Sequence, residues 1–282
     1  MELTLGVTLA VLGAGLLHAG WNALLKSSVR GDAMLDTAVV VAGSSLWGLV
    51  VVPFTGVPNV AAWPYMAVSA VVHFGYYITL AQAYRSGDLS FAYPLMRGTA
   101  PLLTTVLGSI FLRELPGVAM MVGILLISLG IVSIAFLHHH RHPPSAAYWA
   151  FANAGLIAVY TLVDGTGARA SGNPIAYVAW LIFLEGIPFL VWVVARRGRP
   201  ALAYLRQSTR NGLIGGGCSL AAYGIVLWAM TRAPIGAVAA LRETSVLFAA
   251  LMGSFWLKEG FGWRRAAGAA SVVAGIAALK LG

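Results

Sequence analysis

The chain has 282 residues, of which 59% are hydrophobic and only 10% charged, and its formal net charge is +9. Soluble globular proteins carry about 25% charged residues, so this composition excludes an ordinary soluble domain and indicates a membrane-embedded protein. The positive residues lie mostly in short breaks between apolar runs, where they indicate membrane orientation rather than a nucleic-acid partner. The single cysteine, Cys218, excludes a disulfide framework and a thiolate metal cluster.

Apolar runs of about 20 residues, the length that crosses a bilayer, recur along the chain. They predict ten transmembrane helices, at 3–25, 33–54, 61–84, 89–112, 116–137, 147–165, 174–195, 211–231, 235–257 and 263–281. The His- and Pro-rich stretch 138–146 separates five helices from five, so we expect a first domain of 1–137 and a second of 147–282. We interpret its histidines as part of a solvated linker rather than a metal site, and we expect no cofactor.

Residues 97–131 align without a gap on residues 242–276 at a shift of 145 residues, and many residue types recur at equivalent positions. An internal duplication is the simplest explanation. An odd number of helices per copy means that the two copies enter the membrane from opposite sides, as inverted repeats. Inverted repeats supply two equivalent packings around a central site, which alternating access requires. The residues that recur include Arg97 and Arg242, Glu114 and Glu259, Gly123 and Gly268, and Gly130 and Gly275.

The Lys and Arg residues outside the apolar cores are divided unequally between the two ends of the predicted bundle. Twelve fall in the loops that follow the odd-numbered helices, and four fall at the opposite end. Because cytoplasmic loops are enriched in Lys and Arg, this count predicts that both termini lie outside the cytoplasm.

Two arginines lie inside predicted spans, where a charge costs about 2.5–3.5 kcal/mol on insertion scales and must face a partner or a cavity. Arg97 and Arg242 are each about nine residues into their helix, roughly 12 Å deep at 1.5 Å per residue. Inversion would bring them toward the midplane from opposite sides. Pro94 and Pro101 flank Arg97, whereas the second copy has no proline at the equivalent positions, so we expect any broken helix in the first copy.

Several helices carry polar or aromatic residues at i, i+3, i+4 spacing, which places them on one helix face. Together they predict an aromatic, hydrogen-bonding cavity that suits a small zwitterionic or anionic solute. Arg97 is expected to bind a carboxylate or other anionic group, because a guanidinium fork matches that geometry. The predicted solute-binding residues are His18, Trp21, Asn22, His73, Tyr77, Tyr93, Arg97, Tyr160, Tyr223 and Arg242.

Three acidic residues in the predicted spans, Asp164, Glu185 and Glu243, leave two interpretations open. In the first, acids neutralise Arg97 and Arg242 across helices and form a silent ion-pair network. In the second, one carboxylate takes up a proton and couples it to solute movement, since burial favours the neutral form of a carboxyl group. Asp164 lies near the end of its predicted helix, which favours an interfacial position.

Each copy ends in a Leu-(Arg/Lys)-Glu loop, at Leu112–Glu114 and Leu257–Glu259, followed by a glycine-spaced helix, and the first helix contains Leu-His-Ala-Gly-Trp-Asn at 17–22. In these features the chain resembles the EamA-like branch of the drug/metabolite transporter superfamily over nearly its whole length. The resemblance implies a ten-helix secondary transporter of small metabolites, often an exporter, and termini in the cytoplasm, opposite to the charge count. We expect a bacterial-type inner membrane, with lipid and a small solute as partners. One chain supplies both repeats, so a monomer suffices, and a homodimer stays open.

Two rival functions remain at this level. The sequence lacks a Walker loop and the HExxH, GxSxG and Rossmann fingerprints, so we do not expect an enzyme. An intramembrane enzyme acting on a lipid or isoprenoid head group would use Asp164 or Glu185 as general base and form product without net solute movement. A passive scaffold or channel would show no saturable, pH-dependent flux.

Overall fold

The computed structural model describes residues 2–26, 32–87, 89–136, 143–249 and 263–281, without the side chains at 21–26, 33, 89–90 and 264–265. Within these ranges the chain forms eleven α-helices, one 3-10 helix and no strand, which confirms the all-helical class. The elements are α1 (Leu5–Lys26), α2 (Ala33–Thr55), η1 (Val60–Ala62), α3 (Trp63–Ser86), α4 (Leu89–Phe111), α5 (Val118–Ala135), α6 (Pro144–Ala170), α7 (Pro174–Arg197), α8 (Arg199–Gln207), α9 (Thr209–Met230), α10 (Ile235–Arg242) and α12 (Trp263–Leu281).

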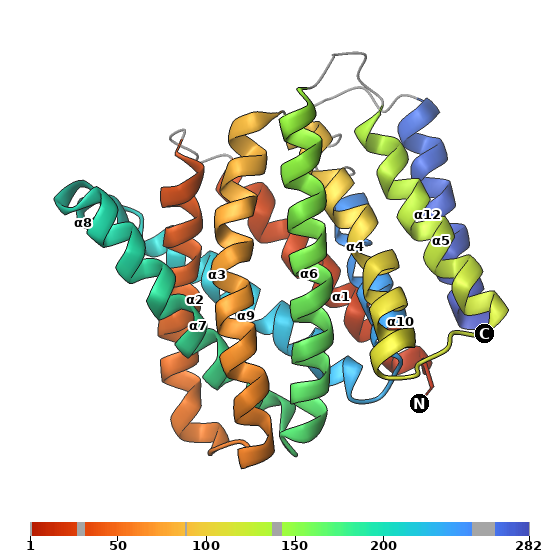
Figure 1. Cartoon of the computed structure of the whole chain (residues 1–282), viewed down its shortest axis with the longest axis horizontal. Helices are drawn as coiled ribbons and strands as arrows, with labels where there is room; N and C mark the ends of the chain where they lie inside the picture. Colours follow the sequence, from red (N-terminus) through yellow and green to blue (C-terminus); the bar gives the residue numbers. More distant parts are fainter. Residues whose placement is uncertain (1, 27–31, 88, 137–142, 250–262, 282) are drawn as a thin grey trace.

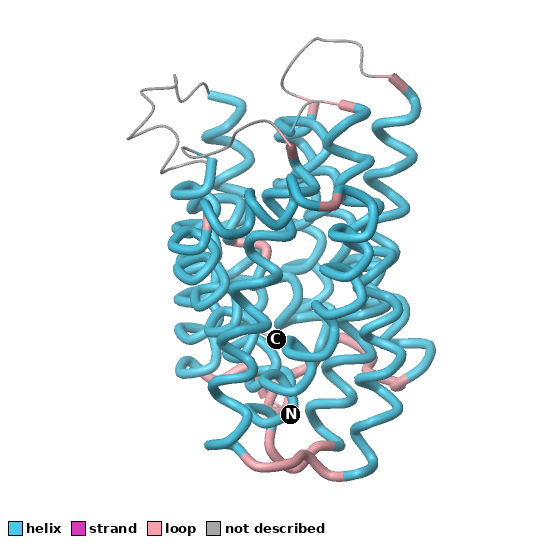
Figure 2. The backbone as a smooth tube through the Cα atoms, turned by 90° about the vertical axis from the view of Figure 1, so that its left-hand side faces the viewer, coloured by secondary structure: helices cyan, strands magenta, loops and turns pink. Residues whose placement is uncertain are grey.

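The long helices run side by side in one bundle, and both chain ends lie toward its lower end (Figures 1 and 2). Six stretches, centred on α2, α3, α5, α6, α7 and α9, are long and apolar enough to cross a membrane. Helices α1 and α12 add shorter apolar stretches, Leu5–Gly20 and Ala266–Leu281. An integral membrane protein is therefore supported, while the count of ten spans stays a prediction.

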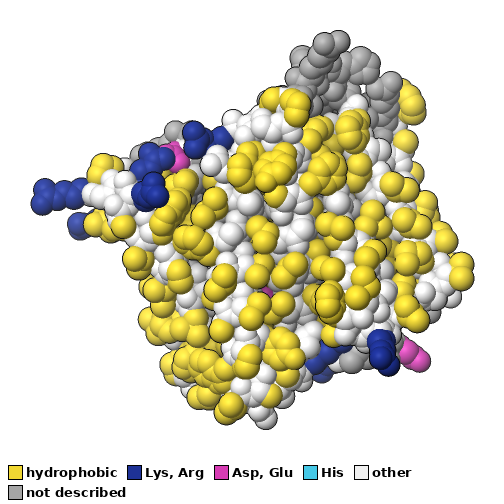
Figure 3. Space-filling model, viewed as in Figure 1, with side chains coloured by type: hydrophobic (Ala, Val, Ile, Leu, Met, Phe, Trp, Pro, Cys, Tyr) yellow, Lys and Arg dark blue, Asp and Glu magenta, His cyan; other side chains and the backbone are white. Residues whose placement is uncertain are grey.

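The surface of the bundle is apolar where lipid tails would lie. Figure 3 shows hydrophobic side chains over the middle of the visible face, with Lys and Arg gathered at the upper left, over α8, and at the lower right. Large apolar side chains point outward along the helices, such as Val71 of α3 at 74% exposure and Leu129 of α5 at 58%. Outward apolar side chains and charged ends are the pattern that a bilayer selects.

The repeated glycines form the contact between α5 and α12, which lie next to each other (Figure 1). A Cβ added at Gly123 would lie 2.8 Å from the carbonyl oxygen of Gly275, and one at Gly130 would lie 2.9 Å from that of Gly268. Small residues thus let the two backbones touch. In the duplication, Gly123 is equivalent to Gly268, and Gly130 is equivalent to Gly275. The contact of Gly123 with Gly275 is therefore equivalent to the contact of Gly268 with Gly130, as expected for two antiparallel helices related by a two-fold axis.

Other helix pairs obey the same symmetry: a contact between two helices recurs between their counterparts in the other copy. Helix α1 packs against α9, and its counterpart α6 packs against α3, the counterpart of α9. Helix α2 likewise packs against α9, and its counterpart α7 packs against α3. The packing therefore fits two inverted halves.

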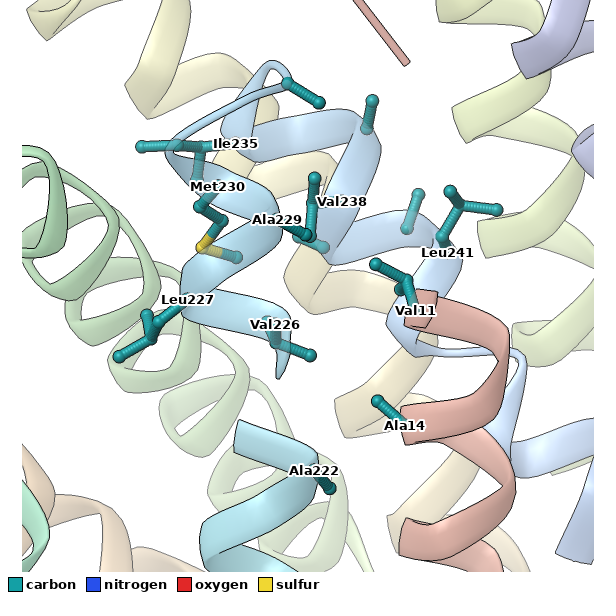
Figure 4. Close-up of a cluster of buried hydrophobic side chains, with 14 of the residues drawn as sticks. Val11, Ala14, Ala222, Val226, Leu227, Ala229, Met230, Ile235, Val238 and Leu241 are labelled. Atoms are coloured by element: carbon teal, nitrogen blue, oxygen red, sulfur yellow. The ribbon is translucent and has the colours of Figure 1, made fainter. Parts of the chain in front are cut away.

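A buried apolar cluster holds α10 inside the bundle between α1 and α9. Val11 and Ala14 of α1, Met230 of α9, and Ile235 and Leu241 of α10 are all 1% exposed or less. Figure 4 shows side chains from these three helices gathered around α10. Because lipid tails are as apolar as these side chains, close packing and dispersion, rather than transfer from water, stabilise this contact.

The expected location of the broken helix is wrong. Helix α4 runs without interruption through Pro94 and Pro101. The predicted helix 235–257 instead stops as α10 at Arg242, turns at Glu243 and Thr244, and resumes at 245–249. Its remaining part, 250–262, lies outside the described residues. The break contains no proline. It lies where Arg242 and Glu243 pair with each other and with Arg97 of α4.

Two further boundaries differ from the prediction. The stretch after α7 forms an additional helix, α8, whose Ala201 is buried while Arg199 and Arg206 are exposed, so this amphipathic segment suits the membrane interface. Helix α6 begins at Pro144 and continues to Ala170, beyond the predicted end at 165. The extra turn at its end encloses Asp164 within the helix.

Candidate functional site

The carboxylate of Glu243 lies between two arginines. Its Oε2 is 2.5 Å from Nε of Arg97 on α4, and its Oε1 accepts hydrogen bonds of 3.2 Å from Nε and Nη2 of Arg242. All three residues are buried, and Glu243 is fully so. Adjacent residues of a regular helix point to different faces. Arg242 and Glu243 converge because the chain turns at Glu243 instead of continuing the helix.

This cluster has two guanidinium groups and one carboxylate, so it carries an excess positive charge. Among the described residues, the buried Nη2 of Arg97 has no hydrogen-bond partner, and its Nε meets Glu243 at ion-pair distance without hydrogen-bond geometry. The guanidinium carbon also lies 5.9 Å from the centre of the Tyr93 ring. Leaving a buried donor unsatisfied costs about 1–3 kcal/mol, and more for a charged group. Arg97 can therefore accept an additional anionic partner.

His73 lies at the centre of a group of four tyrosines. Its ring stacks on Tyr160 of α6 with 4.2 Å between ring centres. The rings of Tyr76 and Tyr77 on α3 and of Tyr223 on α9 lie 6.0, 6.1 and 6.4 Å away. Helical spacing places three of these residues on one face of α3. Packing of α6 and α9 against that face completes an aromatic cage with hydroxyl groups.

Glu185 of α7 faces this cage rather than either arginine. Its Oε1 accepts a hydrogen bond of 3.3 Å from the Tyr77 hydroxyl, and its Oε2 lies 3.2 Å from Nδ1 of His73. The same Nδ1 is 3.1 Å from the carbonyl oxygen of Ser69. The interpretation of a silent ion-pair network therefore fits Glu243 and does not fit Glu185.

Asp164 is fully buried, which corrects the expected interfacial position. Its Oδ1 accepts from the Tyr177 hydroxyl at 3.1 Å, and its Oδ2 accepts from the Tyr223 hydroxyl at 2.5 Å. Tyr177 was missed at the sequence level, because no helical spacing links it to Asp164 across the turn between α6 and α7. Gly167 provides the room, since a Cβ there would lie 2.4 Å from the Tyr177 hydroxyl.

One end of the bundle is tied together by Glu114, the loop glutamate of the first copy. It forms an ion pair with Arg169, at the end of α6, and its Oε2 accepts a hydrogen bond of 2.9 Å from the backbone nitrogen of Ile235. Arg169 also donates to the carbonyl oxygens of Met230 and Ala233, at 2.7 and 3.1 Å. A carboxylate at a helix N-terminus is favourable, and α10 has no side-chain cap of its own. Repetition drew attention to Glu114, whereas nothing in the sequence indicated Arg169 as its partner.

The remaining predicted residues are partly described. His18 lies on α1 and is half-buried. Trp21 and Asn22 lie on the last turns of α1, but their side chains fall outside the described set. The histidines at 138–142 and the second loop glutamate, Glu259, also lie outside the described residues. Among the residues that are described, no group of three or more His, Cys, Asp or Glu could hold a metal ion.

The fold and this site define a helical membrane protein whose packing fits two inverted halves around buried arginines, acids and tyrosines. The model of the EamA-like transporter family matches residues 4–136 and 144–281. The chain therefore belongs to the EamA-like transporter family, a family of membrane transporters that fits the drug/metabolite transporter superfamily.

Comparison with solved structures agrees with this assignment. One crystal structure, described only as that of a protein, superposes with a TM-score of 0.78 at 20% sequence identity and covers 98% of this chain and 98% of its own. At this identity the similarity supports the fold alone. No curated protein sequence matches the chain.

Proposed function

We propose that the protein is a secondary transporter that moves a small amino-acid-like solute, zwitterionic or anionic, by alternating access around a midplane site between the repeats. One observation carries this proposal. Within the part of the chain that the structure describes, Arg97 and Arg242 share a single carboxylate, Glu243, and the buried Nη2 of Arg97 has no hydrogen-bond partner. A solute carboxylate would supply both the missing acceptor and the missing negative charge.

The bonds of the other two acids support the same conclusion. Asp164 is held by tyrosine hydroxyls and Glu185 by Tyr77 and His73, so neither is committed to the arginines. A site that served only structure would be expected to balance its buried charges with its own residues, because each uncompensated charge is costly. The imbalance at the arginines favours a transient anionic ligand.

The ion pair at one end of the bundle supports alternating access. The Glu114 and Arg169 pair joins the ends of α4, α6 and α9 to the start of α10. At the same shift of 145 residues, Arg169 of the second copy corresponds to Leu24 of the first copy, so the arginine of this ion pair is not repeated. We infer that the two ends open by different means. Family resemblance supports export from a bacterial-type inner membrane.

Thermal stability of the purified protein against amino acids, organic acids, amines and lipid-like molecules tests the proposal. A ligand at 100 times its Kd adds about 2.7 kcal/mol to the free energy of unfolding, which a melting curve resolves. We expect zwitterions or anions to stabilise the protein, and Arg97→Ala to abolish both this shift and flux in liposomes. Arg232→Ala is the matched control, because Arg232 stacks on Trp228 near the end of α9, away from Glu243.

Two results would overturn the proposal. In the first, only cations or lipid-like molecules stabilise the protein, which would return the intramembrane enzyme to consideration. In the second, a correctly inserted Arg97→Ala protein transports its solute at the wild-type rate, which would remove Arg97 from the mechanism.

A further inference from the structure

The segment that joins α7 to α9, and that contains α8, is strongly basic. It contains no acidic residue and five exposed arginines: Arg196, Arg197, Arg199, Arg206 and Arg210. Figure 3 shows basic side chains gathered at the upper left, over α8. Among the described residues, the acids that contact this segment are Asp32 and Asp36, at the start of α2. Five arginines against two acids leave an excess of three positive charges at this surface.

Most of these arginines are not neutralised by the chain itself. Arg197 forms an ion pair of 3.3 Å with Asp32. Arg196 lies over the ring of Trp192, with 5.6 Å between its guanidinium carbon and the ring centre. In the part of the chain that the structure describes, no ion pair joins the other three arginines to an acid. Their charges therefore face the surroundings of the protein.

Packing fixes α8 against the bundle. Ala201 is fully buried and belongs to an apolar cluster with Ala38 of α2 and Val193 of α7. The Tyr204 hydroxyl donates a hydrogen bond of 2.6 Å to Oδ1 of Asp36 on α2. The opposite face of α8 therefore points away from the bundle in a fixed orientation.

The outward face of α8 combines positive charge with an apolar side chain. Arg199, Leu202 and Arg206 lie at i, i+3 and i+7 spacing, which places them on one helix face. Leu202 is 52% exposed, between the two arginines. In a helix that lies at a membrane interface, such a leucine enters the boundary of the acyl chains, while arginines reach the lipid phosphates.

The chemistry of this face selects an anionic lipid over a soluble anion. A guanidinium group matches the geometry of a phosphate, with two parallel hydrogen bonds. A soluble phosphate would leave Leu202 in water, whereas a phospholipid covers both the charges and the leucine. The count of Lys and Arg predicts that this end of the bundle lies in the cytoplasm, and the anionic lipids of the cytoplasmic leaflet attract basic segments.

We propose that α8 is a docking site for anionic phospholipids, whose phosphates bind Arg199 and Arg206 while Leu202 enters the boundary of the acyl chains. This inference goes beyond the proposed function and holds whatever solute the protein moves. Helix α8 contacts α2, α7 and α9. A lipid bound to α8 therefore holds the start of α2, the end of α7 and the start of α9 at the membrane surface.

Lipid binding to the purified full-length protein tests the proposal. The protein in a non-ionic detergent is titrated with phosphatidylglycerol and with phosphatidylcholine of identical acyl chains, and native mass spectrometry measures the bound fraction. A basic residue near an anionic membrane surface contributes about fivefold in affinity, so two arginines predict a preference of about 25-fold for phosphatidylglycerol. The preference should shrink between about 50 and 500 mM ammonium acetate, because salt screens exposed charges.

Paired substitutions assign the preference to α8. Arg199→Gln with Arg206→Gln should weaken phosphatidylglycerol binding about 25-fold and leave phosphatidylcholine binding unchanged. The matched control, Arg113→Gln with Arg232→Gln, removes two exposed arginines from the opposite end of the bundle and should keep the preference. Leu202→Gln retains every charge and should weaken the binding of both lipids alike. All of the substituted side chains are exposed, so each variant should melt at the wild-type temperature.

The lipid proposal fails on any of three results. In the first, the wild-type protein binds the two lipids equally. In the second, the α8 pair of substitutions keeps the preference, or the control pair loses it to the same extent, which would make it an effect of overall charge. In the third, glycerol 1-phosphate, which has no acyl chains, displaces phosphatidylglycerol and so assigns the arginines to a soluble anion. None of these results involves Arg97, so the transporter proposal stands or falls separately.

Discussion

Helix α4, which carries Arg97, is continuous and contains two prolines. The equivalent segment of the second copy, which carries Arg242, is broken after α10 and contains no proline. In α4, helical conformation persists through Pro94 and Pro101. After α10, the backbone nitrogens of Glu243, Thr244 and Val246 donate to carbonyl oxygens three residues earlier, as in a 3-10 turn. The broken segment thus keeps its backbone hydrogen bonds while it turns, so a break inside a membrane does not require proline.

The residue after each arginine explains why the two copies differ. The position of Glu243 corresponds to Gly98 in the first copy. A Cβ at Gly98 would lie 2.6 Å from the Val132 side chain and 2.9 Å from the carbonyl oxygen of Ser128, so α5 leaves no room for a side chain there. The first copy therefore contributes a cation on a tightly packed helix, and the second contributes both a cation and the shared anion at a turn.

The largest effect is expected from Glu243→Gln, which removes the anion that the two arginines share. Two buried cations would then lack a counter-charge, and the free energy of unfolding should fall by about 3–5 kcal/mol. Denaturant unfolding in mixed lipid–detergent micelles measures this loss. Removing one cation as well, in Arg242→Gln with Glu243→Gln, should restore part of it. A loss below about 1 kcal/mol would mean that another group neutralises the arginines.

Exchanging proline between equivalent positions tests the comparison itself. Ala239→Pro places proline inside α10 at the position that corresponds to Pro94, and should cost about 3 kcal/mol by removing an N–H and introducing a steric clash. Pro94→Ala in α4 should change the free energy of unfolding by less than about 1 kcal/mol, because α4 already accommodates a proline at this position without a break. Equal effects at the two positions, measured by the same unfolding experiment, would contradict the asymmetry described here.

A smaller loss of stability is expected at the contact that joins the end of α4 to the start of α10. Glu114 follows α4 and binds the first backbone nitrogen of α10. Because its side chain and that of Arg169 are partly solvated, Glu114→Ala should destabilise the protein by about 1 kcal/mol. Hydrogen exchange at the Ile235 amide should become faster, which mass spectrometry detects. Exposed Glu2 offers the control variant, Glu2→Ala, which should leave that amide unchanged.

Much of the site could be predicted because charged and aromatic residues are rare inside apolar segments. Arg97, Arg242 and Glu243 stood out for that reason, and the structure brings them together. Helical spacing likewise placed His73 and Tyr77 on one face of α3. The partners of Asp164, Glu185 and Glu243 could not be predicted, because they depend on which hydrogen-bond donors of other helices reach each carboxylate.

The sequence by itself determined the membrane class, the duplication, the family and the rare polar residues inside the spans. These follow from composition, helical spacing and self-similarity, which are local or one-dimensional properties of a chain. Only the tertiary structure decided where the segment 235–249 breaks, that Tyr177 reaches Asp164, that Arg169 binds Glu114, and that Glu185 meets Tyr77 and His73. Each of these depends on side chains from different helices meeting at about 3 Å, a distance that only the packing of the whole bundle sets.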